Sequence, residues 1–170
     1  QNKVVLFADT YTSFHEDHIG RKAIRLLENL GFDVKLFAKG CCQRPAFSLG
    51  LLEKAKVNGQ KTILDLFEFA GDAPVIVLEP GCASALIDDL PDLLDDREMS
   101  EVVKSKVFLL EEFLYEHDEN SEPGDVRLKL KNGSYAVHGH CHHKALWGLE
   151  HMKSWFAKYV DGDILWMDSG

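Results

Sequence analysis

The chain lacks long apolar runs, an excess of positive charge and the glycine-rich motifs of nucleotide-binding sites. No apolar run approaches the ~18–20 residues that a membrane-spanning helix requires, so we expect no membrane span. The formal net charge is −9, which argues against nonspecific binding to nucleic acid, because its phosphates require a basic face. Neither Gly-x-Gly-x-x-Gly nor a P-loop is present, so we expect no nucleotide site within the chain.

No targeting segment is evident either. A strand-like pattern begins at Val4, which argues against a signal or transit peptide. The missing initiator Met suggests that the chain is cut from a longer one. Only four cysteines occur in 170 residues. Without a secretion signal they indicate reduced thiols or metal ligands in the cytoplasm, rather than a disulfide framework.

Alternation of apolar strand patterns and helical patterns predicts an α/β domain. Its core is expected to be a Rossmann-like, mainly parallel sheet with flanking helices. An Asn132-Gly133 turn predicts a hairpin between residues 126–131 and 134–138, and the acidic stretch 88–97 is expected to be irregular. Strands are predicted over residues 4–8, 32–37, 74–78 and 163–167, and helices over 17–30, 48–70, 100–117 and 144–159.

The cysteines stand at the ends of these strands. Cys41 and Cys42 are adjacent, and adjacent cysteines rarely bond each other because the bond would distort the peptide between them. Such a pair in a loop is often a pair of metal ligands. Cys82 and Cys141 each follow a strand of their own. Ligands of parallel α/β sheets bind beyond the carboxyl ends of strands, so we expect the four cysteines to gather there.

An internal repeat becomes visible when residues 4–42 are laid over residues 135–170. Residues 7–11 fall on 138–142, so that Thr10 occupies the slot of Cys141. The glycine that precedes Cys41 falls on Gly170. The repeat predicts a first copy over 1–125, the truncated start of a second over 126–170, and another cysteine pair beyond Gly170.

Three motifs carry a family resemblance over most of the chain. Residues 41–45, Cys-Cys-Gln-Arg-Pro, resemble Cys-Cys-Gly-x-Pro; residues 79–82 resemble Pro-Ser-Cys; residues 138–142 resemble His-Asp-Pro-Cys-His. Together they resemble the cysteine-rich CCG domain of heterodisulfide reductases, of the iron–sulfur subunits of glycolate and glycerol-3-phosphate oxidases, and of lactate-utilisation proteins. Gln43 replaces the usual glycine, and Thr10 replaces a family cysteine.

The resemblance implies an iron–sulfur electron-transfer domain of an FAD-linked oxidoreductase acting on a 2-hydroxyacid such as D-lactate or glycolate. It implies cluster ligation by four cysteines, with nearby histidines beside the ligands. FAD would lie on a separate dehydrogenase module, with a ferredoxin-like module in the same chain or complex. The assembly would be cytoplasmic, or peripheral to the inner membrane through its partners. With ligands missing, residues 1–170 alone are expected to lack the cluster and activity. The implied ligands are Cys41, Cys42, Cys82 and Cys141, and the neighbouring histidines are His138, His140 and His142.

Other interpretations stay open. The cysteines could be inert buried thiols, a thiol-disulfide or heterodisulfide reductase site, or the remnants of a site in a non-catalytic docking module. The histidine-rich run around Cys141 could hold zinc, and it weakly resembles the signature of metallo-β-lactamase-like hydrolases. Arg44 could meet an anion or lie in solvent, and the acidic stretch is expected to be a solvated loop.

Overall fold

The computed structural model describes residues 2–119, 133–160 and 162–167. The chain forms two compact units, residues 1–110 and 111–170, which are described separately. The first arm of the predicted hairpin and the predicted repeat boundary at residue 125 lie outside the described residues.

The first unit is built on a four-stranded sheet in which all neighbouring strands are parallel, in the order β2-β1-β3-β4. The two central strands are apolar and almost fully buried, as expected where helices cover both faces. This architecture confirms the predicted α/β fold with a parallel sheet. The strands are β1 (Lys3–Phe7), β2 (Asp33–Phe37), β3 (Val75–Val77) and β4 (Val107–Leu109).

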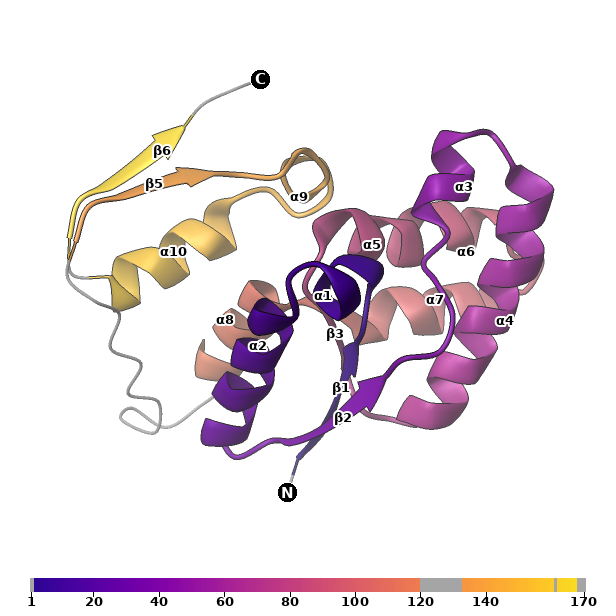
Figure 1. The fold of residues 1–170 in the computed structure, drawn as a ribbon, viewed down its shortest axis with the longest axis horizontal. Helices are drawn as coiled ribbons and strands as arrows, with labels where there is room; N and C mark the ends of the chain where they lie inside the picture. Colours follow the sequence, from indigo (N-terminus) through magenta and orange to yellow (C-terminus); the bar gives the residue numbers. More distant parts are fainter. Residues whose placement is uncertain (1, 120–132, 161, 168–170) are drawn as a thin grey trace. The chain divides into compact units, whose positions relative to one another are not determined.

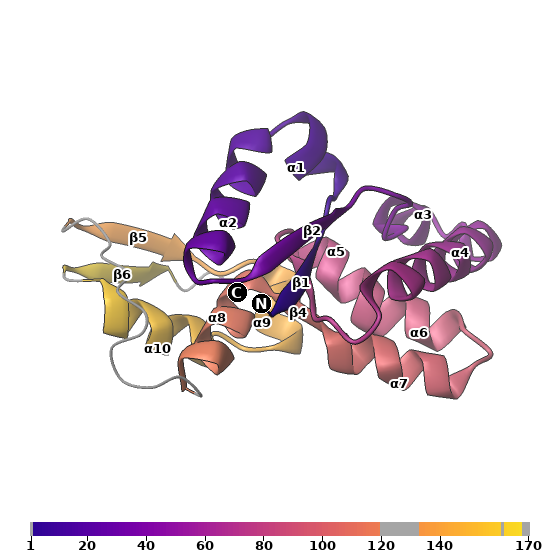
Figure 2. The ribbon, with the colours of Figure 1, turned by 90° about the horizontal axis from the view of Figure 1, so that it is seen from below.

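Helices occupy every connection between these strands (Figure 1). Figures 1 and 2 place α2 on one side of β1 and β2 and α4 on the other. The helices of this unit are α1 (Thr10–Phe14), α2 (Asp17–Asn29), α3 (Arg44–Ser48), α4 (Leu52–Ala70), α5 (Pro80–Ser84), α6 (Leu90–Leu93) and α7 (Arg97–Lys106), with a π-helical segment η1 (Ala85–Asp89) between α5 and α6.

Two sequence predictions in this unit are wrong. The stretch 88–97 is largely helical. The segments α5, η1 and α6 form one continuous helical rod over residues 80–93, which buries Leu90 and Pro91. The predicted helix 100–117 is interrupted by β4, whose residues pair with β3. A three-residue strand is too short to show its own periodicity beside a helical pattern, so its pairing with β3 decides the conformation.

Gly59 lies inside the second long helix, where glycine could interrupt the helical pattern, but α4 runs through it. The residue is buried, and a Cβ atom at this position would overlap the side chain of Leu90 from α6. Glycine therefore permits close approach of α4 and α6, at the cost of a lower helix propensity.

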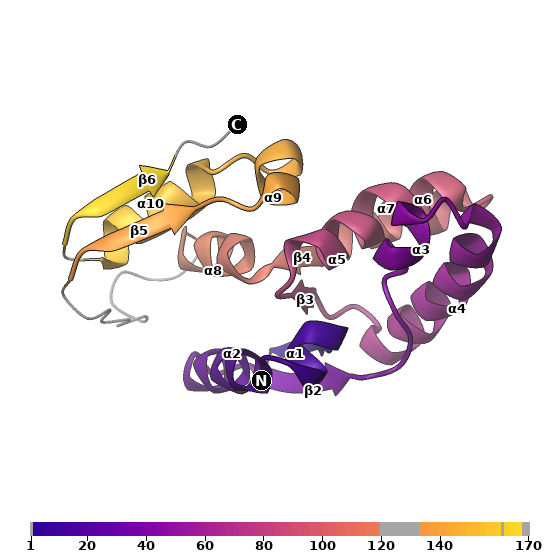
Figure 3. The same ribbon diagram turned by 45° about the horizontal axis from the view of Figure 1, so that its top comes forward.

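The second unit contains a smaller parallel sheet, in which β5 pairs with β6 (Figure 3). Two helices connect these strands. Among the described residues, no helix is both long and apolar enough to cross a membrane. The elements of the second unit are α8 (Leu110–Glu119), β5 (Tyr135–His138), α9 (Cys141–Leu146), α10 (Glu150–Tyr159) and β6 (Ile164–Met167).

Candidate cysteine site

Three cysteines of the first unit meet beyond the carboxyl ends of its strands. Cys41 and Cys42 follow β2, and Cys82 follows β3, so their loops lie on either side of the end of β1. The Sγ atoms of Cys42 and Cys82 are 2.9 Å apart. The predicted convergence is therefore observed for these three residues, whereas Cys141 belongs to the second unit and is described with it.

The surroundings of Cys41 and Cys42 favour the neutral form of these two thiols. Cys42 is 3% exposed. Contact with Cys41 lowers the pKa of Cys42, but contact with Cys82 and burial outweigh it and raise that pKa to about 12. A hydrogen bond to Cys42, together with burial, raises the pKa of Cys41. Metal ligation requires thiolates, so metal binding at this group would release protons.

The loop that carries Cys41 and Cys42 has an unusual backbone. Gly40 has φ +84, and a Cβ there would overlap Thr62 of α4. The Thr62 Oγ1 accepts a hydrogen bond from the Cys41 N–H at 3.3 Å. These contacts anchor the start of the loop to α4.

Gln43, which stands where the resembled family has glycine, adopts the left-handed conformation with φ 65. This region favours glycine, because a Cβ crowds the backbone there. The Gln43 N–H points to the Cys41 Sγ at 3.4 Å, and its side-chain Nε2 donates to the Cys41 carbonyl at 3.1 Å. The left-handed turn thus aims a backbone donor at a sulfur, and Gln43 achieves it without being glycine.

Cys82 lies in the first turn of α5, as predicted. The Glu79 side chain caps this helix, because its Oε2 accepts a hydrogen bond from the Cys82 N–H at 2.6 Å. A Cβ on Gly81 would lie 2.9 Å from the same carboxylate oxygen. The absence of a side chain at Gly81 therefore leaves room for the cap that holds the backbone of Cys82.

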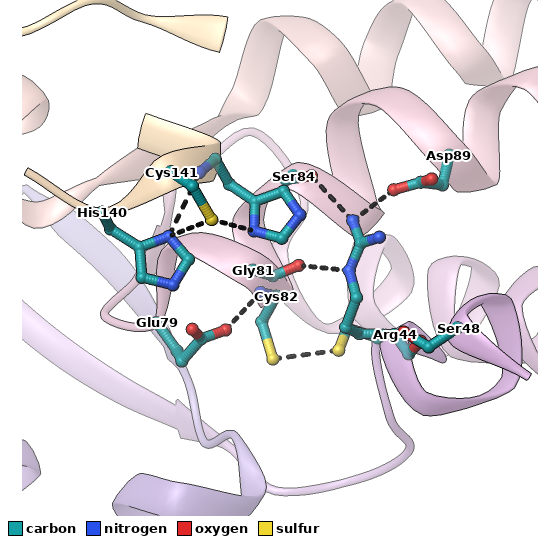
Figure 4. Close-up of polar contacts among 11 residues, drawn as sticks. Arg44, Ser48, Glu79, Gly81, Cys82, Ser84, Asp89, His140 and Cys141 are labelled. Atoms are coloured by element: carbon teal, nitrogen blue, oxygen red, sulfur yellow. Dashed lines mark hydrogen bonds and ion pairs between the residues drawn. The ribbon is translucent and has the colours of Figure 1, made fainter. Parts of the chain in front are cut away.

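Arg44 links the two cysteine-bearing segments (Figure 4). Its Nε donates to the Gly81 carbonyl at 3.2 Å, and its Nη2 donates to the Ser84 Oγ at 2.7 Å and forms an ion pair with Asp89. The expected anion-binding or solvated arginine is therefore replaced by an intramolecular contact. Neither Ser84 nor Asp89 is predictable as a partner of Arg44 from the sequence, because both are distant from it along the chain and the acidic stretch around Asp89 is typical of a solvated loop.

The second unit presents its own group of potential ligands at the start of α9. The Cys141 Sγ lies 3.9 Å from the Nδ1 atoms of both His140 and His142, and the three ligand atoms lie within 4.8 Å of one another (Figure 4). The His140 ring caps the helix by accepting from the His142 N–H at 3.2 Å. His138 ends β5 and is exposed.

One histidine of the run around Cys141, His143, makes a buried contact that the sequence does not predict. His143 is buried, and its Nδ1 lies 3.2 Å from a carboxylate oxygen of Glu111 in α8. Burial, and then the charges of His140 and His151, lower the pKa of His143, while burial raises the pKa of Glu111. Both directions favour the uncharged forms of the two residues. The expected helix begins at Lys144, so no pattern in the sequence distinguishes His143 from the neighbouring histidines.

The two units share an order of elements: a strand, a short helix, a longer helix and a parallel strand. Thr10 and Cys141 are each the first residue of the short helix. The preceding residues, Asp9 and His140, each cap that helix through the side chain. The predicted overlay of Thr10 on Cys141 therefore has a structural counterpart in the capping contacts.

Sequence comparison relates the chain to lactate-utilization proteins. It is 28% identical over 153 residues to Lactate utilization protein A of Bacillus cytotoxicus, covering 87% of this chain and 61% of that protein. It is 26% identical over 168 residues to Lactate utilization protein A 2 of Bacillus mycoides, covering 96% of this chain and 67% of that protein. A Bacillus cereus Lactate utilization protein A is 26% identical over 153 residues.

The chain thus spans about three fifths to two thirds of the length of these relatives. No protein-family model matches the chain, and no solved structure matches it. The comparisons therefore establish similarity to proteins named for lactate utilization.

Proposed function

We propose that this chain is a CCG-type iron–sulfur domain that transfers electrons in an FAD-linked oxidoreductase of a 2-hydroxyacid such as D-lactate or glycolate. The observation that carries the proposal is the meeting of Cys41, Cys42 and Cys82 at one edge of the sheet. Similarity to proteins named for lactate utilization supports the substrate class.

The donor set fits an iron–sulfur cluster, because cysteine thiolates are the usual ligands of such clusters. Cys41, Cys42 and Cys82 would hold the cluster in the first unit. In the second unit Cys141 would be a ligand, with His138, His140 and His142 around it, completed by a cysteine pair beyond Gly170. When bound, the cluster would supply one-electron redox chemistry.

The chain's own residues prepare the site. Each thiol must lose a proton when it becomes a ligand, and the raised pKa of Cys42 makes this loss costly in the metal-free protein. The Gln43 N–H, aimed at the Cys41 sulfur, would stabilise negative charge on that ligand. Hydrogen bonds to ligand sulfurs are among the features that set cluster potentials.

The remaining partners follow from the same proposal. An FAD-binding dehydrogenase module would oxidise the 2-hydroxyacid, and a ferredoxin-like module would exchange electrons with this domain in the same chain or complex. We place the assembly in the cytoplasm, or at the inner membrane through its partners. Residues 1–170 alone would be inactive.

The test is iron and sulfide content in the full-length protein, purified without oxygen. We expect a brown protein with iron and acid-labile sulfide, and loss of most of the first-unit iron in Cys42→Ser and Cys82→Ser. Ser105→Ala, a hydroxyl change at an exposed position of α7, serves as a control that retains iron. Full-length protein without iron under these conditions would contradict the proposal.

The 2.9 Å contact between Cys42 and Cys82 favours a second candidate, a thiol-disulfide or heterodisulfide reductase. Such an enzyme would turn over a disulfide substrate with an electron donor, and would lose this activity in Cys42→Ser. If serine at Cys41 and Cys42 left the full-length oxidoreductase fully active, the domain would instead act as a docking module.

A further inference from the structure

The loop that carries Cys41 and Cys42 and the helical rod that carries Cys82 are joined by one guanidinium group. Arg44 follows the cysteine pair by two residues and reaches the rod at three points: Gly81, Ser84 and Asp89. Its side chain is 24% exposed, and that of Asp89 is 27% exposed. Ser84 is 2% exposed. A partly buried, charge-assisted contact of this kind is stronger than an ion pair in open solvent.

The π-helical segment determines which aspartate meets Arg44. In an α-helix successive residues are turned by about 100°, so residues 81, 84 and 88 would share one face. The segment η1 (Ala85–Asp89) places an extra residue in its turn, because a π-helix bonds residue i to i+5. Asp89 therefore takes the place that Asp88 would hold in a regular helix, and Asp88 is exposed.

The contacts fix the rod relative to the loop near the sulfur atoms. Gly81 directly precedes Cys82, and Arg44 is two residues from Cys42. A shift of the loop along the rod would have to break the Arg44 contacts with Gly81 and Ser84. The planar guanidinium, with donors in a fixed fork, restrains direction as well as distance.

We propose that Arg44, paired with Asp89, is a positioning residue that sets the separation and orientation of the Cys42 and Cys82 thiols. The inference deepens the proposed function, since these thiols are two of its proposed ligands. It predicts that the pair of thiols is preorganised before any metal binds.

Preorganisation can be measured without metal through reversible disulfide formation in the full-length protein. In a glutathione buffer, the Cys42 and Cys82 thiols together give two electrons and two protons to one glutathione disulfide. The products are the Cys42–Cys82 disulfide and two molecules of glutathione. Mass spectrometry measures the fraction of protein in which the two cysteine peptides are linked, and this fraction gives the equilibrium constant of the exchange. The constant has the units of a concentration and is the effective concentration of one thiol at the other.

Asp89→Ala and Asp88→Ala form a matched pair, since both remove one carboxylate from neighbouring positions of η1. We expect Asp89→Ala to lower the effective concentration about fivefold to tenfold, the equivalent of one typical hydrogen bond. Asp88→Ala is expected to change it less than twofold. Equal values for the two variants would overturn the proposal.

Arg44→Lys tests whether the planar arrangement of the guanidinium donors is required. Lysine keeps the charge opposite Asp89 but cannot present the planar set of donors to Gly81 and Ser84. We expect an effective concentration between those of the wild type and Arg44→Ala. A value for Arg44→Ala equal to that of the wild type would contradict the positioning role.

Two further variants separate positioning from general loss of stability. Gly31→Ala strains the backbone at a positive φ without an added contact, so it should lower the urea midpoint without changing the effective concentration. Should Arg44→Ala fail to fold, Ser84→Ala removes only the 2.7 Å contact and is expected to lower the effective concentration about twofold to threefold. No change in Ser84→Ala would then overturn the proposal.

Failure of this inference is distinguishable from failure of the proposed function. Iron-free full-length protein in which Asp89→Ala still weakens the disulfide would refute the cluster and leave the positioning role intact. If the full-length protein binds iron but Asp89→Ala and Asp88→Ala have the same equilibrium constant for the disulfide, the cluster would be supported and the positioning role refuted.

Discussion

The sulfur atoms of Cys42 and Cys82 lie 2.9 Å apart, although 40 residues separate them in the chain. Their loops leave β2 and β3, the two strands that flank β1, and meet across its carboxyl end. A parallel sheet thus brings together thiols that no local motif could pair.

Thiol alkylation should distinguish the two units. Cys42 is buried and its pKa is raised to about 12, whereas Cys141 is exposed. In metal-free full-length protein at pH 7.5, we expect iodoacetamide to modify Cys141 at least tenfold faster than Cys42, as read by peptide mass spectrometry. The rate at Cys42 should keep rising well above pH 8.5, the ordinary pKa of a thiol, because the thiolate is the reactive form.

Urea supplies the control for this measurement, since unfolding should bring the two cysteines to similar rates. Equal rates in the folded protein, or a rate at Cys42 that levels off below pH 9, would contradict the buried arrangement.

The left-handed conformation of Gln43 predicts that glycine is better tolerated there than alanine. Gln43→Gly and Gln43→Ala both lose the hydrogen bond to the Cys41 carbonyl, but only Gln43→Gly relieves the Cβ strain. We therefore expect the free energy of unfolding of Gln43→Gly to exceed that of Gln43→Ala by about 0.5–1 kcal/mol, after the added backbone entropy of glycine is subtracted. Gln43→Ala retains the strain and loses the hydrogen bond to the Cys41 carbonyl, so it should lower the free energy of unfolding below that of the wild type by about 0.5–1.5 kcal/mol. Urea denaturation measures the free energy of unfolding of both variants. Equal values for the two would show that the left-handed conformation of residue 43 imposes no Cβ strain.

Gly59 should resist replacement despite its position in a long helix. Helix propensity alone favours alanine by about 1 kcal/mol, but the added methyl group would collide with the buried side chain of Leu90. We expect overpacking to win and Gly59→Ala to lower the free energy of unfolding by about 1–3 kcal/mol.

A double-mutant cycle checks the cause. In a Leu90→Ala background, Gly59→Ala should cost little or become stabilising, because the obstructing side chain is gone. The same penalty in both backgrounds would exclude the proposed overlap.

Gly40 and Gly31 provide a second matched comparison. Both have positive φ, but only a Cβ at Gly40 would meet another residue, Thr62. Gly31→Ala should cost about 1–2 kcal/mol of unfolding free energy from backbone strain, and Gly40→Ala should cost at least about 1 kcal/mol more, because the methyl group would also overlap Thr62. Thermal or urea unfolding gives both values, and similar costs would show that Thr62 yields readily.

The sequence predicted a mainly parallel sheet and the gathering of four cysteines beyond its strands, of which Cys41, Cys42 and Cys82 meet. Buried apolar runs that alternate with helical patterns are local signals, and the end of each strand can be read from them. The contacts of Arg44 with Ser84 and Asp89 were not predictable in this way. Asp89 meets Arg44 only because a π turn shifts the helical register, and the acidic residues around it resemble a solvated loop. The strand β4 was missed for a related reason, since only its pairing with β3 distinguishes it from the surrounding helical pattern.

The capping contacts at Asp9 and His140 have a consequence for how such sites change. In each unit the residue before Thr10 or Cys141 caps the short helix, so the backbone at the strand end does not depend on the side chain at that next position. Thr10 is exposed, and the corresponding position in the second unit holds Cys141. Under the proposed function, one substitution at this position would therefore remove or restore a cysteine ligand without changing the fold, and related domains could differ in their number of ligands.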